Sequence, residues 1–258
     1  MEAWFNSSGE HYPAPVGNIM PNVSENYINM NSSLIDKPIY RIMPIHRLLE
    51  VLEKKQLDLV KPIKWDDPFE NFLLSRPWKT KSSSRIVTLR ADVYGQCWTL
   101  HRETDAMWRI YSSDKQGIKV KTTPRKLLNA LISNDPTYHS GRCFIGKVEY
   151  FGIKKLISAF NKIDLLVSNN LGIPKSLLLK RIEFSHEKEV RIIYSPDKTS
   201  ASDIHHIRIN PDDMFEQVVF DPRMNEELVC AYKLAIKKKG YPNEIKQSEL
   251  YKPPKDIF

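Results

Sequence analysis

Long apolar runs are absent from this sequence, and cysteines are few. No stretch of about 18 apolar residues occurs, which excludes a transmembrane helix, and the first residues lack the basic region and apolar core of a secretory signal. The three cysteines, Cys97, Cys143 and Cys230, are widely spaced and form no Cys-x-x-Cys pair. Such a set argues against a disulfide framework and against a cysteine-based zinc site, and it fits a reducing compartment. We therefore expect a cytoplasmic protein without a membrane partner.

The glycine patterns of the common nucleotide-binding loops are also missing. Neither Gly-x-Gly-x-x-Gly nor Gly-x-x-x-x-Gly-Lys-Ser/Thr occurs, and no Gly-x-Ser-x-Gly elbow presents a serine nucleophile. The seven histidines are scattered, and the adjacent His205 and His206 would point to opposite sides of a strand. A histidine-based metal site is therefore disfavoured. Magnesium held by carboxylates has no such sequence signature and stays an alternative.

Basic residues outnumber acidic ones. Lys and Arg total 39 against 31 for Asp and Glu, which gives a formal net charge of +8. A surplus of this kind favours approach to a polyanion such as nucleic acid. The basic residues are nevertheless spread along the chain, and the compact lysine run at 237–239 can simply complement a helix dipole. The charge permits a nucleic-acid partner without indicating one.

The chain of 258 residues is long enough to form one domain with a sizeable core. Residues 1–36 are rich in Asn, Ser, Pro and Gly and show no lasting periodicity, so we interpret them as an extended or disordered arm. Residues 37–258 contain neither an internal repeat nor a linker that would divide them. We therefore expect a single domain after the arm.

Apolar periodicity separates the domain into alternating and helical stretches. Strands are expected at 38–43, 85–93, 96–100, 116–122, 143–150, 184–194, 204–209, 217–221 and 244–250. Helices are expected at 45–55, 106–111, 124–132, 156–171, 175–182 and 225–239, with a polar loop at 75–84. Because strands and helices do not alternate regularly, the sequence predicts an α+β fold, in which helices pack on a mixed, mostly antiparallel sheet.

The strand predicted at 184–194 carries the most suggestive group of charges. Apolar side chains recur there at period two, so Glu187, Glu189 and Arg191 would share the opposite face. Two carboxylates beside a guanidinium can polarise a sugar hydroxyl or stabilise developing positive charge. A solvated salt-bridge ladder on an outer strand is the other interpretation of the same pattern.

A second acidic group lies at 65–70. Asp67 is expected to cap a helix that begins at Pro68, because Pro suits the first position of a helix. Asp66, Asp67 and Glu70 would then be carboxylates at a helix N-terminus, where the helix dipole favours them.

Five stretches of the chain, taken together, resemble an uncharacterised bacterial family, domain of unknown function two-nine-seven-one. They are residues 40–41, 65–70, 97–99 followed by 107–111, 187–191, and the strand-helix-strand at 218–250. The ordered set spans roughly residues 38–250. The family name implies no activity.

The chain also shows a more distant resemblance to ADP-ribosyltransferases of the arginine-serine-glutamate type. These enzymes carry an Arg on an early strand, a Ser or Thr on a middle strand and Glu-x-Glu on a late strand, and Arg41, Thr99, Glu187 and Glu189 occur in that order. The resemblance implies that Arg41 grips the phosphates or ribose of NAD and that Thr99 positions the nicotinamide ribose. It implies that Glu189 stabilises the transition state as nicotinamide leaves, while Glu187 orients the acceptor.

The resemblance also implies roles for several aromatic residues. Trp98, Trp108 and Tyr111 would supply a flat wall for nicotinamide, and Tyr40 would line the same cleft beside Arg41. The same aromatic residues could equally be core residues, which is their usual place. The sequence departs from the transferase pattern at 97–99, where Cys-Trp-Thr replaces Ser-Thr-Ser.

Three functions remain in competition. The first is an NAD-consuming mono-ADP-ribosyltransferase or NAD glycohydrolase, acting as a bacterial toxin or phage-defence effector on a nucleic-acid or protein acceptor, with a cognate antitoxin left open. The second is a non-enzymatic module that binds nucleic acid or protein. The third is a magnesium-dependent nuclease that would use five carboxylates, Asp66, Asp67, Glu70, Glu187 and Glu189.

Overall fold

The computed structural model describes residues 23–253 except for 66, 68, 71–76, 81–82, 89–92, 136–141, 164–170 and 197–199. Its centre is a ten-stranded sheet. Along its main path the strands follow the order β1 (Tyr27–Ile28), β8 (Cys143–Lys147), β11 (Glu189–Tyr194), β6 (Tyr94–Thr99), β2 (Ile39–Pro44), β7 (Gly117–Thr122), β13 (Gln217–Phe220) and β14 (Glu244–Gln247). Neighbours are antiparallel except for the outermost pairs, β1 with β8 and β13 with β14. The predicted α+β class and the mostly antiparallel sheet are confirmed.

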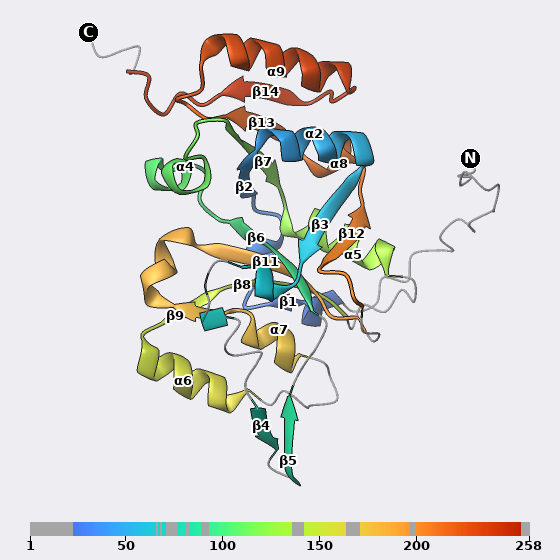
Figure 1. The fold of residues 1–258 in the computed structure, drawn as a ribbon, viewed down its shortest axis with the longest axis vertical. Coiled ribbons are helices and arrows are strands. Elements are labelled where there is room, and N and C mark those ends of the chain that lie inside the picture. The colour runs from blue at the N-terminus through green and yellow to red at the C-terminus, as the bar shows by residue number, and fades with distance from the viewer. Residues whose placement is uncertain are drawn as a thin grey trace, which may run out of the picture.

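Helices pack along both halves of the sheet. They are α1 (Ser32–Ile35), α2 (Ile45–Lys54), α4 (Asp105–Tyr111), α5 (Pro124–Asn134), α6 (Ile153–Lys162), α7 (Gly172–Ser176), α8 (Pro211–Met214) and α9 (Glu226–Lys238), with 3-10 turns η1 (Val23–Asn26), η2 (Pro62–Lys64) and η4 (Ile182–Glu187). Figure 1 shows α9 beside β14 at one end of the molecule. In the described part of the chain, no helix has the length and apolar character needed to span a membrane.

The helix ends follow local sequence signals. Thr104 caps α4, as its hydroxyl accepts a hydrogen bond from the main-chain nitrogen of Met107 at 3.2 Å. Asn225 caps α9 in the same manner through Glu227, and Gly240 follows that helix with a left-handed φ of 86°. These caps fix where the chain enters and leaves the sheet.

Strand β6 joins the two halves of the sheet. Along one edge it pairs with β11 over its full length, from Glu189 opposite Thr99 to Tyr194 opposite Tyr94. Along the other edge, the described residues pair it with β2 only at Tyr40 and with β3 (Gln56–Val60) only at Val60. Strand β3 continues outward to β12 (Ile204–Arg208). The sheet therefore forks where β2 departs from β6.

Part of the predicted arm is folded onto the domain. Strand β1 pairs in parallel with β8, and the buried Asn26 donates a side-chain hydrogen bond to the carbonyl of Cys143 at 2.6 Å. Short α1 follows before β2. The sequence does not reveal these contacts, because a two-residue strand is too short to leave a periodic pattern. Residues 1–22 lie outside the described part.

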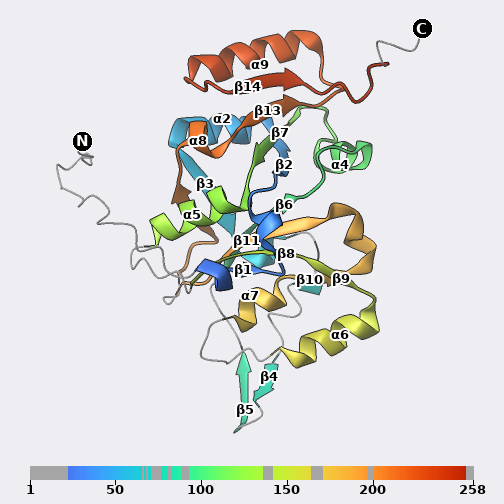
Figure 2. The ribbon, with the colours of Figure 1, turned by 180° about the vertical axis from the view of Figure 1, so that it is seen from behind.

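Several other elements differ from the sequence prediction. The loop expected at 75–84 contains most of a hairpin, β4 (Pro77–Thr80) with β5 (Ser83–Thr88). The strand expected at 143–150 divides at Val148 into β8 and β9 (Glu149–Phe151). The helix expected at 175–182 gives way to β10 (Leu179–Arg181), which pairs with β9 in a separate small sheet. Figure 2 shows β9, β10 and α6 together at the lower part of the molecule.

The stretch predicted as one strand from 184 to 194 is half turn and half strand. Its first part belongs to η4, and Lys188 adopts a left-handed conformation with φ 43° before β11 begins at Glu189. The period-two apolar pattern starts only at Val190, and it extends backwards no further than the observed strand.

Candidate active site

A pocket opens at the fork between β2 and β6. Its volume is about 130 Å³. The residues that line it are Tyr40, Arg41, Ile42, Cys97, Trp98, Thr99, Met107, Tyr111, Glu187 and Glu189. They come from β2, β6, α4, the end of η4 and the start of β11, which are far apart in the sequence. Because β2 and β6 pair through a single residue pair, their diverging backbones leave room between them.

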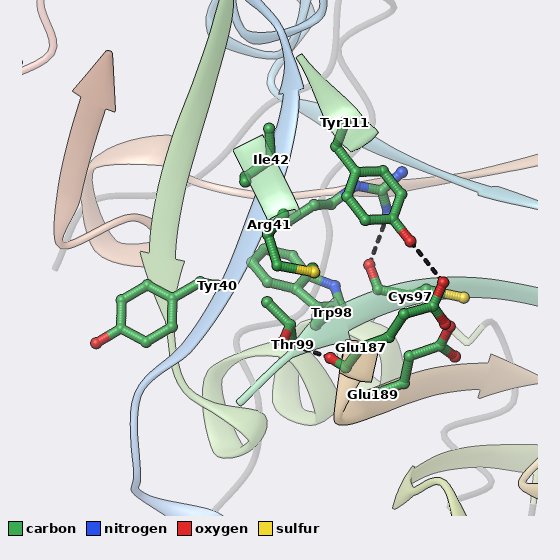
Figure 3. A pocket seen from close by; sticks show the side chains of 10 residues that line it. Tyr40, Arg41, Ile42, Cys97, Trp98, Thr99, Tyr111, Glu187 and Glu189 are labelled. Atoms are coloured by element: carbon green, nitrogen blue, oxygen red, sulfur yellow. Dashed lines mark hydrogen bonds between the residues drawn. The ribbon is translucent and has the colours of Figure 1, made fainter. Parts of the chain in front are cut away.

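Seven of the eight predicted site residues line this pocket. Figure 3 shows Arg41 and Tyr111 on one side and the two glutamates, Glu187 and Glu189, below them. The predicted order of Arg, Thr and paired Glu along the chain therefore becomes one cluster in space.

Trp108 is the predicted site residue that the structure places elsewhere. Its side chain is fully buried, its indole nitrogen donates to Glu103 at 2.8 Å, and the Lys119 ammonium lies 5.4 Å from the ring centre. Met107 and Tyr111 line the pocket instead, because residues four apart share one face of α4. Trp108, one position after Met107, points to the core.

The other two aromatic residues contribute surface to the pocket but belong largely to the core. The indole nitrogen of Trp98 donates to Gln96 at 2.9 Å, and the ring is almost fully buried. Figure 3 shows the Tyr40 ring directed away from the glutamates, and Lys119 lies 5.6 Å from its centre. Tyr111 is the most exposed of the aromatic lining residues, and its hydroxyl donates to Glu187 at 2.9 Å.

Thr99 connects β6 to the turn that carries the first glutamate. Its hydroxyl donates to the main-chain carbonyl of Glu187 at 2.6 Å and accepts from the main-chain nitrogen of His101 at 3.0 Å. The hydroxyl is thus engaged in holding the η4 turn against the end of β6.

Arg41 is a cation without a carboxylate partner in the described part of the chain. Its guanidinium makes one long hydrogen bond, 3.4 Å from Nη1 to the carbonyl of Cys97. Burial lowers the pKa of Arg41, because few groups nearby compensate its charge. A half-buried guanidinium of this kind, at the edge of a pocket, is suited to an anionic ligand.

A buried ionic cluster forms the opposite side of the pocket. Lys180 Nζ lies 2.5 Å from Glu187 Oε2 and 2.7 Å from Glu189 Oε1. Arg191 Nε lies 2.5 Å from Glu189 Oε2, and its Nη2 lies 2.6 Å from Glu70 Oε1. All five side chains are at least nine-tenths buried. The alternative of a solvated ladder on an outer strand is therefore wrong, since β11 is a central strand and its charges are enclosed.

The two pocket glutamates differ in their affinity for a proton. Burial raises the pKa of Glu187, and so does the hydrogen bond that its protonated carboxyl donates to Glu189. Burial would also raise the pKa of Glu189, but Arg191, the bond with Glu187 and Lys180 together lower it well below its usual range. The arrangement therefore keeps the charge on Glu189 and favours a proton on Glu187.

Residues of the 65–70 motif pack against this ionic cluster. Asp67 Oδ1 accepts from the main-chain nitrogen of Phe69 at 3.0 Å and from Arg181 at 2.9 Å. The Trp65 ring lies 4.5 Å from the Arg191 guanidinium, and a side chain at Gly95 would meet that ring at 2.8 Å. The predicted capping contact of Asp67 is present, and Pro68 lies outside the described residues.

These pairings bear on the nuclease alternative. Among the residues that the structure describes, no group of three His, Cys, Asp or Glu side chains is arranged to hold a metal ion. Glu70, Glu187 and Glu189 face Lys180 and Arg191, whose charges take the place that a divalent cation would need. Asp66 is outside the described residues.

Sequence reasoning missed Lys180 and Met107. Lys180 follows three leucines in a stretch whose pattern suggests a helix, and a strand of three residues has no periodicity of its own. Met107 belongs to the 107–111 stretch. Its spacing of four residues from Tyr111 indicates that both side chains share one face of a helix.

Comparison with known proteins gives a limited set of matches. No curated protein has a sequence that matches this chain. Solved structures with some similarity include DarT from Thermus sp. 2.9 in complex with NAD+, at 11% identity and a TM-score of 0.37, covering 83% of this chain and 96% of that chain. The same protein with ADP-ribosylated ssDNA gives 10% identity and a TM-score of 0.38, covering 83% and 95%. Residues 107–192, from the pocket face of α4 into β11, match the family described as Protein of unknown function (DUF2971), which confirms the family resemblance predicted from the sequence.

Proposed function

We propose that this chain is an enzyme that cleaves the bond between nicotinamide and ribose in NAD and transfers ADP-ribose to an acceptor. One observation carries the proposal. One side of the pocket has a guanidinium that forms no ion pair with any described residue, and the other side has a buried, ionised carboxylate. NAD matches both groups: its phosphates are anionic and suit the guanidinium, and its ribose becomes positively charged as nicotinamide leaves and suits the carboxylate.

The chemistry assigns a role to each side of the pocket. Arg41 binds the diphosphate through charge-assisted hydrogen bonds. The bond between ribose C1′ and the nicotinamide nitrogen breaks, and nicotinamide leaves with the electron pair. Glu189 stabilises the resulting oxocarbenium-like ribose, because a fixed carboxylate favours the charged transition state over the substrate's neutral ribose ring.

The remaining lining residues orient the two reactants. Tyr111 and the edge of Trp98 provide the flat surface for nicotinamide. Thr99 acts by fixing the Glu187 turn. Glu187 faces the acceptor and receives its proton when the new bond to C1′ forms. With water as the acceptor, the same step makes the chain an NAD glycohydrolase.

The acceptor and the biological setting belong to the same proposal. The net charge of +8 suits a nucleic acid or an acidic protein as acceptor. We infer a bacterial toxin or phage-defence effector, whose NAD consumption a cognate antitoxin would restrain.

One observation favours a non-enzymatic module as a second candidate. Both oxygens of Glu189 are already bonded, to Lys180 and to Arg191. A cluster whose carboxylate oxygens already have partners needs no function beyond stabilising the sheet. A protein of this kind would bind its partner without consuming NAD.

The test is to incubate the purified chain with NAD and follow nicotinamide release by chromatography. The proposal expects release that depends on the chain and persists in the presence of a metal chelator. The matched control is the Glu189→Gln variant. Wild-type protein that folds, yet releases no nicotinamide with or without nucleic-acid and protein acceptors, would overturn the proposal in favour of the second candidate.

A further inference from the structure

No step of the proposed reaction uses Lys180. It lies on β10, in the small sheet with β9, and its ammonium group enters the pocket wall from behind the glutamates. The main-chain nitrogen of Glu149 donates to the carbonyl of Leu178 at 2.8 Å, which fixes β10 beside β9 just before Lys180. A short strand held in this way delivers the side chain in one orientation.

Lys180 contacts both pocket carboxylates at once. Its Nζ lies 2.5 Å from Glu187 and 2.7 Å from Glu189, with Glu70 at 3.8 Å. The Phe184 ring lies 4.6 Å from the same ammonium group and helps to screen it from water. An ammonium group offers three donors, so it can bridge two carboxylates that would otherwise repel each other.

A charge count within the cluster shows which carboxylate is least compensated. If all three were ionised, Glu70, Glu187 and Glu189 would carry three negative charges against the two positive charges of Lys180 and Arg191. Glu189 pairs with both cations, and Glu70 pairs with Arg191 and lies near Lys180. Within the described ranges, the ion pair of Glu187 is with Lys180 alone.

The charged and titratable groups that share the ionic cluster or the pocket with Glu187 come from several elements. They are Glu189 and Arg191 of β11, Lys180 of β10, Tyr111 of α4, Tyr150 of β9, Glu70 of the 65–70 motif, and Arg41 and Cys97 of the pocket. The Tyr111 hydroxyl is a hydrogen-bond donor to Glu187, while the Tyr150 hydroxyl accepts from the main-chain nitrogen of Glu189. Among the residues that the structure describes, Lys180 is the cation in direct contact with Glu187.

We propose that Lys180 is the positioning residue of this site: it holds the carboxylates of Glu187 and Glu189 side by side and, with Arg191, keeps the charge on Glu189, while its contact with Glu187 lowers the pH at which that buried carboxyl loses its proton. This inference rests on the proposed function for its consequence. Glu187 must lose its proton before it can take one from an acceptor, so turnover rises with pH as Glu187 ionises. Lys180 sets the pH at which this happens.

The first experiment measures the pH profile of nicotinamide release for Lys180→Met. Met keeps most of the side-chain length and removes the charge. Loss of a cation in contact with a carboxylate should move the acid limb of kcat to higher pH by about one unit or more, while the KM for NAD changes little. Lys180→Arg keeps the charge and should restore the wild-type limb. An unchanged profile in a folded Lys180→Met protein would overturn the inference.

A matched control separates positioning from general stability. Lys119 is another buried lysine, 3.2 Å from Glu103, but it does not line the pocket. Lys119→Met should destabilise the fold and leave the acid limb in place. If Lys119→Met moved the limb as far as Lys180→Met, the effect would be structural and the inference wrong.

The second experiment needs neither activity nor a variant at position 180. Carbon-13 labelled glutamate carboxyl groups of the wild-type chain are titrated by NMR without NAD, and Glu187→Gln assigns the resonance. The inference expects Glu187 to titrate above its usual range and Glu189 to stay ionised into acid. Two ordinary titrations, or the reverse assignment, would overturn it. Absent NAD cleavage together with the expected titration would instead refute only the proposed function.

Discussion

The Thr99 hydroxyl donates a 2.6 Å hydrogen bond to the main-chain carbonyl of Glu187, across 88 residues of sequence. It also accepts from the main-chain nitrogen of His101. One side chain on the middle strand therefore sets the position of the first glutamate. The Thr99 side chain would therefore serve chiefly by holding the η4 turn.

Replacing Thr99 by Val tests this contact. Val keeps the side-chain shape but leaves a buried carbonyl and a main-chain nitrogen unpaired, which costs about 1–3 kcal/mol of unfolding free energy. Because Glu187 is displaced rather than removed, kcat should fall while the KM for NAD changes little. Thr99→Ser keeps the hydroxyl and should restore both quantities. Urea unfolding and steady-state nicotinamide release check the two effects, and a fall in kcat that Thr99→Ser shares would contradict the assignment.

Replacing Glu189 by Gln should affect turnover and stability together. In the proposed mechanism the negative charge stabilises the ribose cation, so its loss should lower turnover at least about a hundredfold, as when one strong electrostatic group is deleted. The sequence alone gave no reason to expect a folding defect. The structure does, because the change breaks buried ion pairs with Lys180 and Arg191, and such losses cost about 3–5 kcal/mol.

The control for Glu189→Gln is Glu103→Gln. Glu103 is a partly buried carboxylate paired with Lys119 and Trp108, and it does not line the pocket. The control should lose stability with turnover retained at a temperature well below its unfolding midpoint. Nicotinamide release by Glu189→Gln at the wild-type rate would show that β11 is scaffold.

Much of the site was predictable because its residues carry local signals. Glu187 and Glu189 stand next to a clear period-two strand, and Arg41 lies on a short apolar strand before an amphipathic helix. Their order along the chain was enough to place them in one cleft by resemblance. Trp108 was predicted to line the pocket but is buried in the core, because the sequence pattern does not distinguish an aromatic residue that faces a ligand from one that faces the core.

The remainder depends on contacts between distant segments. Glu70 and Arg191 are 121 residues apart, and nothing local indicates that they pair. Lys180 belongs to the cluster because it lies on a three-residue strand, and the sequence of that segment has the pattern of a helix. The fork itself arises because β6 pairs with β2 at one residue only, a property of the whole sheet rather than of either strand.

The pH dependence of stability provides a test of Glu187. Burial and the bond with Glu189 raise the pKa of Glu187 from its usual 4.5 to about 7 in the folded chain. A raised folded pKa means that the protonated group stabilises the fold below about pH 4.5, and that this contribution is lost as the pH rises through about 7. Glu187→Gln imitates the protonated form and does not titrate.

Wild-type protein should therefore lose stability relative to Glu187→Gln between about pH 5 and pH 8. Urea unfolding of both proteins across this range gives the difference directly, and changes common to both cancel. A difference that stays constant, or that grows in favour of the wild type as the pH rises, would contradict the raised pKa.

Arg41 leads to the last prediction, in which binding and stability move in opposite directions. Its guanidinium is half-buried, has one long hydrogen bond to Cys97, and forms no ion pair within the described residues. Charge-assisted bonds to phosphate contribute about 1.5–3 kcal/mol, so Arg41→Met should raise the KM for NAD roughly ten- to a hundredfold. The unfolding free energy should hold or rise, because a poorly compensated charge is removed. Arg125→Met, which breaks the exposed ion pair with Asp36, is the control and should leave the KM unchanged. An Arg41→Met protein that unfolds more easily while binding NAD as before would make Arg41 a structural residue, and the anion would have to bind elsewhere.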